Sequence, residues 1–295
     1  MKRVSPIVTV LFVLASCSSK DRRETQDNRF IPVRDVETIL VSTQSASPCP
    51  KNMVLVDGEY CPEVEEICLA WSDGHGESVP NPPQKRTPRD WSVSNKCMEY
   101  QAPSRCLSIH TVHKRYCVDR FEYPNVEGQV PQSWMTWHDV KSACESQGKR
   151  LCTESEWTFA CEGIFMQPYP YGDGYHRDST SCNTDNRAPK GVNVMKVTSQ
   201  GSEGGKALDA MLMPAGSMPG CVSPFGVHDM PGNIDEFVLH ESGHPYRSGL
   251  VGGHVFGVRN NCRASTDGHN EQFSWYETGG RCCSDTTPPT QKVTP

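Results

Sequence analysis

The fold is decided by residues 137–163, WHDVKSACESQGKRLCTESEWTFACEG, which predict two short helices joined by a turn. In the first helix, apolar side chains recur at helical spacing on one face: Trp137, Val140, Ala143 and Cys144. Gly148 follows at a place where a residue in the left-handed conformation commonly ends a helix. The first helix is therefore expected to stop there.

The second helix is predicted to begin at a capping box. Thr153 is followed three residues later by Glu156, and these two side chains can satisfy free N–H groups at a helix start. The inward face of this helix is expected to carry Trp157, Ala160 and Cys161. Both apolar stripes end on a cysteine, which suggests that each helix is bonded to a distant segment.

Residues 148–157, GKRLCTESEW, closely resemble the signature of the formylglycine-generating enzyme (sulfatase-modifying factor) family. Residues 213–237 are similar to a second block of that family, Pro-Val-Gly-Ser followed by Gly-Leu-Tyr-Asp-Met-x-Gly-Asn-Val-Trp-Glu-Trp. Residues 252–253 and 279–282 resemble its closing block more loosely. The resemblance extends over about residues 49–285.

This resemblance implies an α+β fold of the C-type-lectin-like type, with a small, irregular mixed sheet and the two helices packed against it. Regular structure should be sparse, because glycine and proline interrupt many segments. Residues 49–117 are expected to form a cysteine-rich N-terminal part and residues 118–285 the core. Residues 286–295 are expected to be a disordered tail.

The first residues have the composition of a processing segment. Two basic residues precede an apolar run over residues 7–15, which is too short to span a bilayer, since that needs ~20 residues. Leu14-Ala-Ser-Cys17 resembles a bacterial lipobox, so residues 1–16 are predicted to be a lipoprotein signal peptide and Cys17 to carry the lipid. The alternative is an ordinary signal peptide that is cut nearby.

The same segment predicts a place in the cell. Ser18 resembles the residue that directs a lipoprotein to the outer membrane, so the chain is expected to be exported and lipid-anchored to the bacterial cell envelope. Residues 17–48 are polar and are predicted to be a flexible tether. The formal net charge is −6, and −8 without Lys2 and Arg3, which argues against nucleic acid as a partner.

The cysteines are expected to form disulfides. Fifteen are present, and setting aside Cys17 leaves an even number in an exported chain. The family resemblance implies the pairs Cys144–Cys282 and Cys161–Cys262, and we also expect Cys182–Cys221. The partners of the others stay open, because spacing alone does not settle connectivity: Cys49, Cys61, Cys68, Cys97, Cys106, Cys117, Cys152 and Cys283.

The resemblance also implies a calcium site in residues 229–236. The ligands would be the side chains of Asp229 and Glu236 and the carbonyl groups of Gly232 and Ile234. Oxygen ligands on a glycine-containing turn suit Ca²⁺, whose role would be structural. The alternative is a solvated acidic turn. Asn183 is a candidate for a second site.

Catalytic members of the family hold copper between two cysteines and oxidise a cysteine of a client sulfatase. Counting without gaps from Gly252 puts Gly257 in the first of these positions and Cys262 in the second. The spacing of Cys262 from Cys282 fits the structural disulfide better. Because Cu(I) needs thiolate ligands, copper and formylglycine generation are not expected here. The alternative is an active oxidase that uses other free thiols, such as Cys152 or Cys283.

Two further patterns are candidate sites. The run His240-Glu-Ser-Gly-His244 matches a zinc-protease motif, but Gly243 and Pro245 disfavour the helix that this motif requires. Three aromatic residues, Phe273, Trp275 and Tyr276, lie where the family has its substrate groove, although ordinary packing is an equal alternative.

The sequence as a whole predicts a non-catalytic binding or envelope-structural lipoprotein of this family. The alternatives are a formylglycine-generating oxidase and a module that binds a protein, peptide or glycan ligand. These three functions make different structural demands on the cysteines and on the aromatic cluster.

Overall fold

The two predicted helices are present, and each begins at a capping box. Helix α1 is Trp137–Ser146, where the Thr136 side chain accepts from Asp139 N and the Asp139 carboxylate accepts from Thr136 N. It ends at Gly148, which has a φ of 69°, with the paired 6→1 and 5→2 bonds of a Schellman motif. Helix α2 is Glu154–Glu162, with Thr153 as its N-cap and Glu156 completing the box.

The computed structural model describes residues 47–72, 78–79, 96–257 and 259–286. The predicted signal peptide, Cys17, nearly all of the tether and nearly all of the tail lie outside these residues. The described residues belong to one compact unit, Ala46–Pro295. None of their helices is long and apolar enough to cross a membrane.

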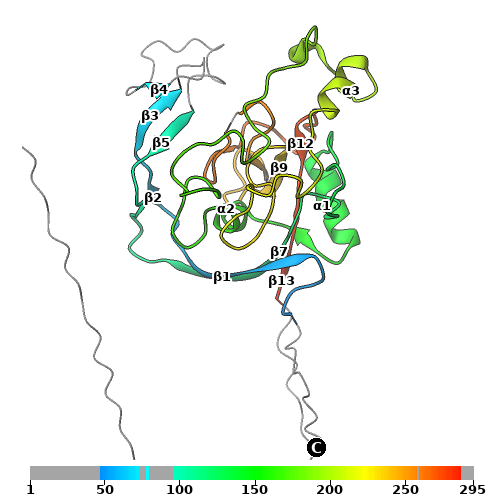
Figure 1. The fold of residues 1–295 in the computed structure, drawn as a ribbon. Helices are drawn as coiled ribbons and strands as arrows, with labels where there is room; N and C mark the ends of the chain where they lie inside the picture. Colours follow the sequence, from blue (N-terminus) through cyan, green and yellow to red (C-terminus); the bar gives the residue numbers. More distant parts are fainter. Residues whose placement is uncertain (1–46, 73–77, 80–95, 258, 287–295) are drawn as a thin grey trace, which may run out of the picture. The chain divides into compact units, whose positions relative to one another are not determined.

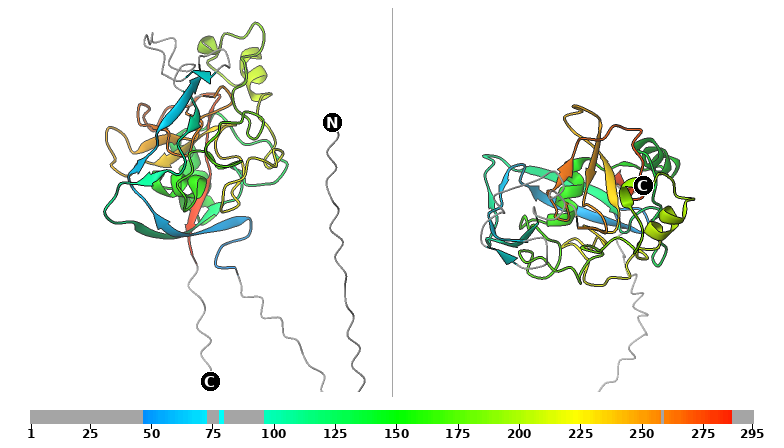
Figure 2. Two further views of the ribbon diagram at one scale, coloured as in Figure 1. Left: turned by 60° about the vertical axis from the view of Figure 1, so that its left-hand side comes forward. Right: turned by 90° about the horizontal axis from the view of Figure 1, so that it is seen from above.

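A four-stranded antiparallel sheet brings the two ends of the described chain together (Figure 1). Its strand order is β1-β7-β13-β8, with these bounds: β1 Met53–Tyr60, β7 Val112–Asp119, β13 Cys282–Asp285 and β8 Arg150–Leu151. β1 and β7 pair along their whole length, from Met53 opposite Asp119 to Tyr60 opposite Val112. Figure 2 shows the blue start and the red end of the described chain close to each other.

The predicted calcium and aromatic residues flank the strands of a second four-stranded sheet. Its order is β11-β10-β9-β12, with these bounds: β11 Ser265–Thr266, β10 Ser248–Val251, β9 Asp235–Leu239 and β12 Thr278–Gly279. β12 runs parallel to β9, and the other pairs are antiparallel. The calcium candidates therefore lie at the start of β9, and the aromatic candidates lie just before β12.

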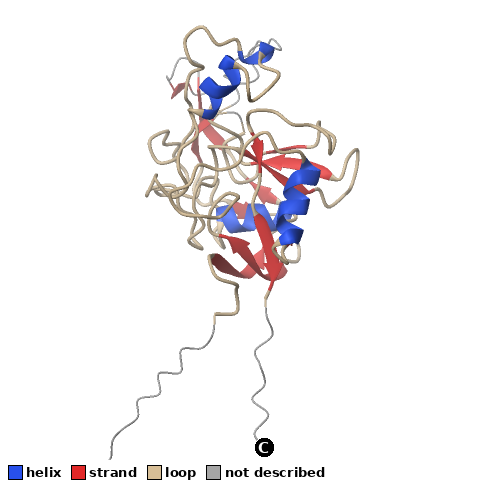
Figure 3. Cartoon of the chain, turned by 90° about the vertical axis from the view of Figure 1, so that its right-hand side faces the viewer, coloured by secondary structure: helices blue, strands red, loops and turns tan. Residues whose placement is uncertain are grey.

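The remaining elements are short, and loops connect most of them (Figure 3). The N-terminal part contains β2 Val64–Glu65 paired with β6 Arg105–Cys106, and the order β4-β3-β5, where β4 is Ser78–Val79, β3 is Cys68–Ser72 and β5 is Cys97–Tyr100. A 3₁₀ turn, Val194–Lys196, and helix α3, Glu203–Asp209, lie in the long connection before β9. The sparse regular structure expected from the sequence is thus observed.

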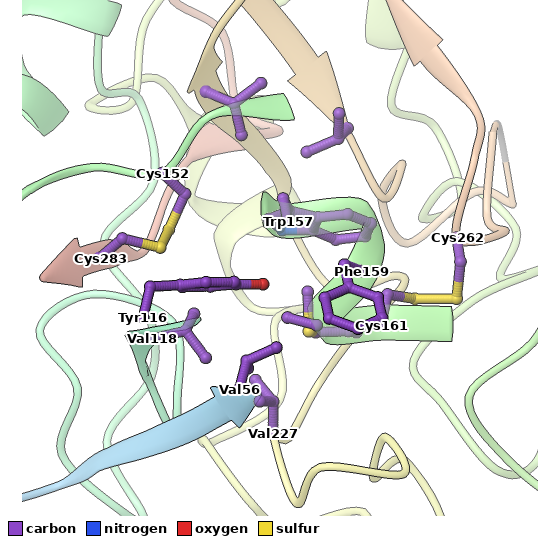
Figure 4. Close-up of a cluster of buried hydrophobic side chains, with 14 of the residues drawn as sticks. Val56, Tyr116, Val118, Cys152, Trp157, Phe159, Cys161, Val227, Cys262 and Cys283 are labelled. Carbon is purple, nitrogen blue, oxygen red and sulfur yellow. A yellow bond between two sulfur atoms is a disulfide. The ribbon is translucent and has the colours of Figure 1, made fainter. Parts of the chain in front are cut away.

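Helix α2 lies in the centre of the hydrophobic core (Figure 4). Trp157, Phe159 and Cys161 on this helix have no exposed surface. The chain passes so close to Trp157 that a Cβ at Gly252 would lie 2.7 Å from its ring. Glycine is therefore required at that position, where φ is also +84°.

Every cysteine in the described residues is in a disulfide. The structure pairs Cys144 with Cys282, Cys161 with Cys262, and Cys182 with Cys221, which are the three pairs expected from the sequence. The four pairs that were left open are Cys49–Cys117, Cys61–Cys106, Cys68–Cys97 and Cys152–Cys283. Cys152 and Cys283, which were named as possible free thiols of an oxidase, are therefore bonded to each other in the structure.

Candidate functional site

The loop after β10 contains Gly257, the position that aligns with the first catalytic cysteine of the family. Gly257 lies in this loop with a φ of +75°, which L side chains rarely adopt. A Cβ built there would overlap the carboxylate of Asp185 and the amino group of Lys96. Lys96 and Asp185 form an ion pair, and Lys96 Nζ also approaches Phe256 O at 3.5 Å. The space for a side chain at Gly257 is thus already filled.

Asp185 is held in place from a second side by Arg177. Arg177 Nε donates to Asp185 Oδ2 at 2.8 Å, and Nη2 donates to Oδ1 at 3.1 Å. Burial raises the pKa of Asp185, but the hydrogen bonds and charges of Arg177 and Lys96 outweigh it and hold this pKa below its usual value. Lys96 directly precedes β5, so the cysteine-rich N-terminal part supplies one half of the ion pair beside Gly257.

A buried charged cluster is formed by the same loop, the start of β9 and the residue directly before β12. His254 Nε2 is 3.0 Å from Glu277 Oε2, and Arg259 forms an ion pair with Asp235. Burial lowers the pKa of His254 to about 4, so its ring is neutral at pH 7. Asp235 Oδ1 and Arg259 Nε are buried and have no hydrogen-bond partner. We call His254, Asp235, Arg259 and Glu277 the charged cluster.

The predicted aromatic residues form one continuous array that leads to this charged cluster. The ring centroids of Phe273 and Trp275 are 6.3 Å apart, and those of Trp275 and Tyr276 are 5.4 Å apart. Tyr276 then lies 5.7 Å from the ring of His254. Tyr276 is buried, while Phe273 and Trp275 are only partly buried. Packing accounts for Tyr276, and the other two rings still offer a surface.

The calcium candidates are close to one another, but the Glu236 carboxylate has other partners. Arg281 Nε lies 3.0 Å from Glu236 Oε1 and 2.7 Å from Oε2, and Trp157 Nε1 donates to Oε2 at 3.0 Å. Asp229 Oδ2 accepts from Gly216 N at 2.8 Å. Burial raises the pKa of Asp229 to about 6. Calcium at this turn stays a prediction, and Arg281, which directly precedes Cys282, was missed as a partner of Glu236.

The backbone of the same turn depends on its glycine and on Asn183. Gly232 has a φ of +100°, and its N–H donates to Gly252 O at 3.0 Å. A Cβ at Gly232 would lie 2.8 Å from Asn183 O. Asn183 Nδ2 donates to Asn233 Oδ1 at 2.7 Å. The structure therefore places Asn183, the candidate for a second site, beside the turn where the first site is predicted.

Glu122 is a buried acid that the sequence reasoning missed. Its Oε2 accepts from Asn233 Nδ2 at 2.7 Å, and its Oε1 accepts from Ile234 N at 3.3 Å. Burial, with smaller contributions from Asp229 and Glu236, raises the pKa of Glu122 well above its usual value. The available signal was its place in residues 116–125, which resemble a strand and turn of the family.

The zinc-like motif lies in a turn after β9, as the sequence reasoning expected. Gly243 has a φ of 65°, so His240 and His244 are not on one helix. Glu241 accepts from Ser155 N at 3.0 Å and from Ser155 Oγ at 2.8 Å, which ties this turn to the first turn of α2. In the described part of the chain, no group of three or more His, Cys, Asp or Glu side chains is arranged to hold a metal ion.

Comparison with known families settles the relationship that the short motifs suggested. Residues 42–286 match the family described as "Sulfatase-modifying factor enzyme 1-like domain". The chain belongs to this family. The α+β, C-type-lectin-like fold of the sulfatase-modifying-factor type that the sequence predicted is thereby confirmed, with the disulfide-rich and irregular structure that was expected.

Two mammalian members of this family are similar in sequence over part of the chain. Both are named "Inactive C-alpha-formylglycine-generating enzyme 2": the Bos taurus protein is 28% identical over 116 residues and the Mus musculus protein 30% over 112 residues. These matches cover 38% and 37% of this chain. They span about a third of the relatives themselves, 34% and 32% of their lengths.

Solved structures with a similar course of the chain include PvdO from Pseudomonas aeruginosa and CarF. PvdO is 15% identical with a TM-score of 0.44, and the match covers 82% of this chain and 96% of PvdO. CarF is 13% identical with a TM-score of 0.46, and the match covers 80% of this chain and 98% of CarF. At these values the likeness bears on the fold alone.

Proposed function

We propose that this sulfatase-modifying-factor family member is a non-catalytic binding protein of the bacterial cell envelope. The observation that carries the proposal is the loop at Gly257. The position that would hold the first copper ligand has no side chain, and Lys96 and Asp185 fill the space beside it. The second candidate, Cys262, is bonded to Cys161. Because Cu(I) is a soft ion that needs thiolates, this loop offers it no ligand pair.

The names of the two mammalian relatives support this proposal. Both are described as inactive formylglycine-generating enzymes, so the family includes members without the activity. Their matches cover only about a third of their lengths, so the geometry of the loop at Gly257 is the stronger support for the proposal.

Two measurements on the oxidised, purified chain test the absence of catalysis. In the first, the chain is incubated with Cu(I), oxygen and a cysteine-containing peptide. The mass of the peptide then shows whether its thiol has been converted to an aldehyde. The second titrates Cu(I) against a chromophoric chelator. We expect neither aldehyde nor stoichiometric copper binding. An active family enzyme assayed in parallel shows that the assay works, and aldehyde formed by this chain would overturn the proposal.

We place the binding surface at the aromatic array that begins with Phe273 and Trp275. Partly exposed aromatic rings give large contact areas at low entropic cost, which suits recognition of a peptide or protein segment. The adjoining charged cluster supplies a second kind of contact through Arg259, whose side chain is 25% exposed. Peptide and glycan arrays probed with the same sample distinguish the two ligand classes, and binding to neither would remove this surface from the proposal.

Attachment to the envelope is proposed from the lipobox-like Leu14-Ala-Ser-Cys17 alone. Two or three acyl chains on Cys17 would hold the protein to a bilayer, because a single chain gives only marginal binding. The test is the mass of the N-terminal peptide after export, with the Cys17→Ala variant as its control. An unmodified N-terminus on a soluble exported protein would favour the ordinary signal peptide instead.

A further inference from the structure

Arg281 is a fully buried cation at the start of β13, and it joins four segments of the fold. Its side chain has no exposed surface. Its Nη1 donates to Asp119 O at 3.3 Å, and its Nη2 donates to His228 O at 3.1 Å and to Glu236 Oε1 at 2.7 Å. The guanidinium thereby connects the end of β7, the chain just before Asp229, and β9 to its own strand.

The Glu236 carboxylate is saturated by these contacts. Each of its two oxygens lies within 3.0 Å of two donors: Arg281 Nε and Nη2 for Oε1, and Arg281 Nε and Trp157 Nε1 for Oε2. A calcium ion needs six to eight oxygen ligands, and Glu236 is one of the two side chains that the family resemblance assigns to it in this turn. Calcium would have to displace Arg281 from Glu236.

Displacement would be unfavourable for a physical reason. The guanidinium has no route to solvent, because neither Arg281 nor Glu236 has more than 1% of its side chain exposed. A buried charge that loses its partner costs far more than the pair contributes when intact. The set of oxygen ligands available to a calcium ion is also incomplete, since Asp229 Oδ2 already accepts a hydrogen bond from Gly216 N.

We propose that Arg281 takes the role of the metal ion in this chain, so that an internal guanidinium holds the Asp229–Glu236 turn and the fold does not depend on calcium. The turn has the residue types that bind calcium, and the guanidinium group of Arg281 supplies the positive charge that balances them. Trp157 fixes the Glu236 carboxylate from the other side, which links the turn to the centre of the core.

The test uses the full oxidised chain, dialysed against EDTA and then returned to buffer with or without Ca²⁺. We expect elemental analysis to find far less than one calcium per chain before dialysis, and the Tm to be the same in EDTA and in Ca²⁺. A site that is saturated with Ca²⁺ at a hundredfold excess over its Kd would instead raise the Tm by about 5–10 °C. Such a rise, or one bound calcium per chain, would overturn the proposal.

Substitutions of Arg281 test the same proposal. Arg281→Met is expected to lower the Tm far more than Arg105→Met, a control at an exposed ion pair with Glu65. The double variant Arg281→Met/Glu236→Leu is expected to recover part of the loss, because it leaves no buried charge unpaired. If Arg281→Met does not fold, the calcium and EDTA measurements on the unchanged protein still decide the question. Equal losses in Arg281→Met and Arg105→Met would contradict it.

Discussion

Lys96 and Asp185 form an ion pair beside Gly257, at the position that aligns with a catalytic cysteine of the family. The two residues come from distant segments, one from the cysteine-rich N-terminal part and the other from the long loop before β9. The cysteine-rich N-terminal part is therefore integrated into the domain, because its Lys96 helps to fill the space beside Gly257.

Gly257→Ala measures how tightly that space is filled. The substitution combines the strain of a left-handed residue with overlap of Lys96 and Asp185, so we expect it to lower the free energy of unfolding by about 2–4 kcal/mol. Gly243→Ala is the matched control, because Gly243 also has a positive φ but has no heavy atom within 4 Å of its Cβ position. The control should lose only about 1 kcal/mol. Equal losses in denaturant titrations would mean that the space at Gly257 is open.

Trp275→Ala tests the proposed binding surface. Trp275 Nε1 donates to Val197 O at 2.9 Å, so removal of the ring should cost stability by about 1–3 kcal/mol and leave the chain folded. Binding of the ligand found on the arrays should fall by at least about tenfold, as at a typical hot spot. Tyr246→Ala removes a partly exposed aromatic ring outside the array and serves as the control. Unchanged affinity in Trp275→Ala and Phe273→Ala would place the ligand elsewhere.

The pH dependence of stability should carry a contribution from Glu66. Burial raises its pKa to about 7 against the opposing charge of Arg263, and its Oε1 is buried without a hydrogen-bond partner. As pH rises from about 4.5 to 7, the unfolded chain releases this proton while the folded chain keeps it, so stability is lost over that window.

The variant Glu66→Gln should flatten this part of the pH profile by up to about 3 kcal/mol between the two limits. Denaturant titrations at a series of pH values measure it. Glu65→Gln reports the general effect of removing one acidic charge from the same segment. A profile for Glu66→Gln that has the same slope as the unchanged chain would show that Glu66 is ionised in the fold.

The Cys161–Cys262 bond should contribute to stability in proportion to the loop that it closes. The two residues are 101 positions apart, and the chain-entropy treatment gives about 4–5 kcal/mol for a loop of that length. The Cys68–Cys97 bond spans 29 positions and should contribute about 1 kcal/mol less. Paired Cys→Ala variants of each bond, compared by denaturant unfolding, test this order. A larger loss at Cys68–Cys97 would contradict it.

Local features of this fold could be predicted from the sequence, and long-range polar contacts could not. The capping box at Thr153 and Glu156 depends on residues three positions apart, so the pattern alone identifies it. The Cys144–Cys282 bond came from the family resemblance, since no local rule joins residues 138 positions apart. Cys152 and Cys283 had no such precedent and stayed open until the structure paired them.

The candidate site shows the same limit. The sequence identified Glu236 as a candidate calcium ligand, but its partner Arg281 lies 45 positions away, directly before β13. It identified Gly257 as a vacant position, but not that Lys96 fills the space, because Lys96 precedes Gly257 by more than half the described chain. A buried ion pair is specified by the three-dimensional packing of both residues, which a one-dimensional pattern does not contain.

The central claim is that the cysteines of this domain hold the fold together and do not carry out chemistry. The most direct measurement unfolds the mature protein without reductant, alkylates it and maps every cysteine by mass spectrometry. The disulfides of the structure predict no alkylation at any of the fourteen positions from Cys49 to Cys283. Two alkylated cysteines, with Cys262 as one of them, would contradict the account.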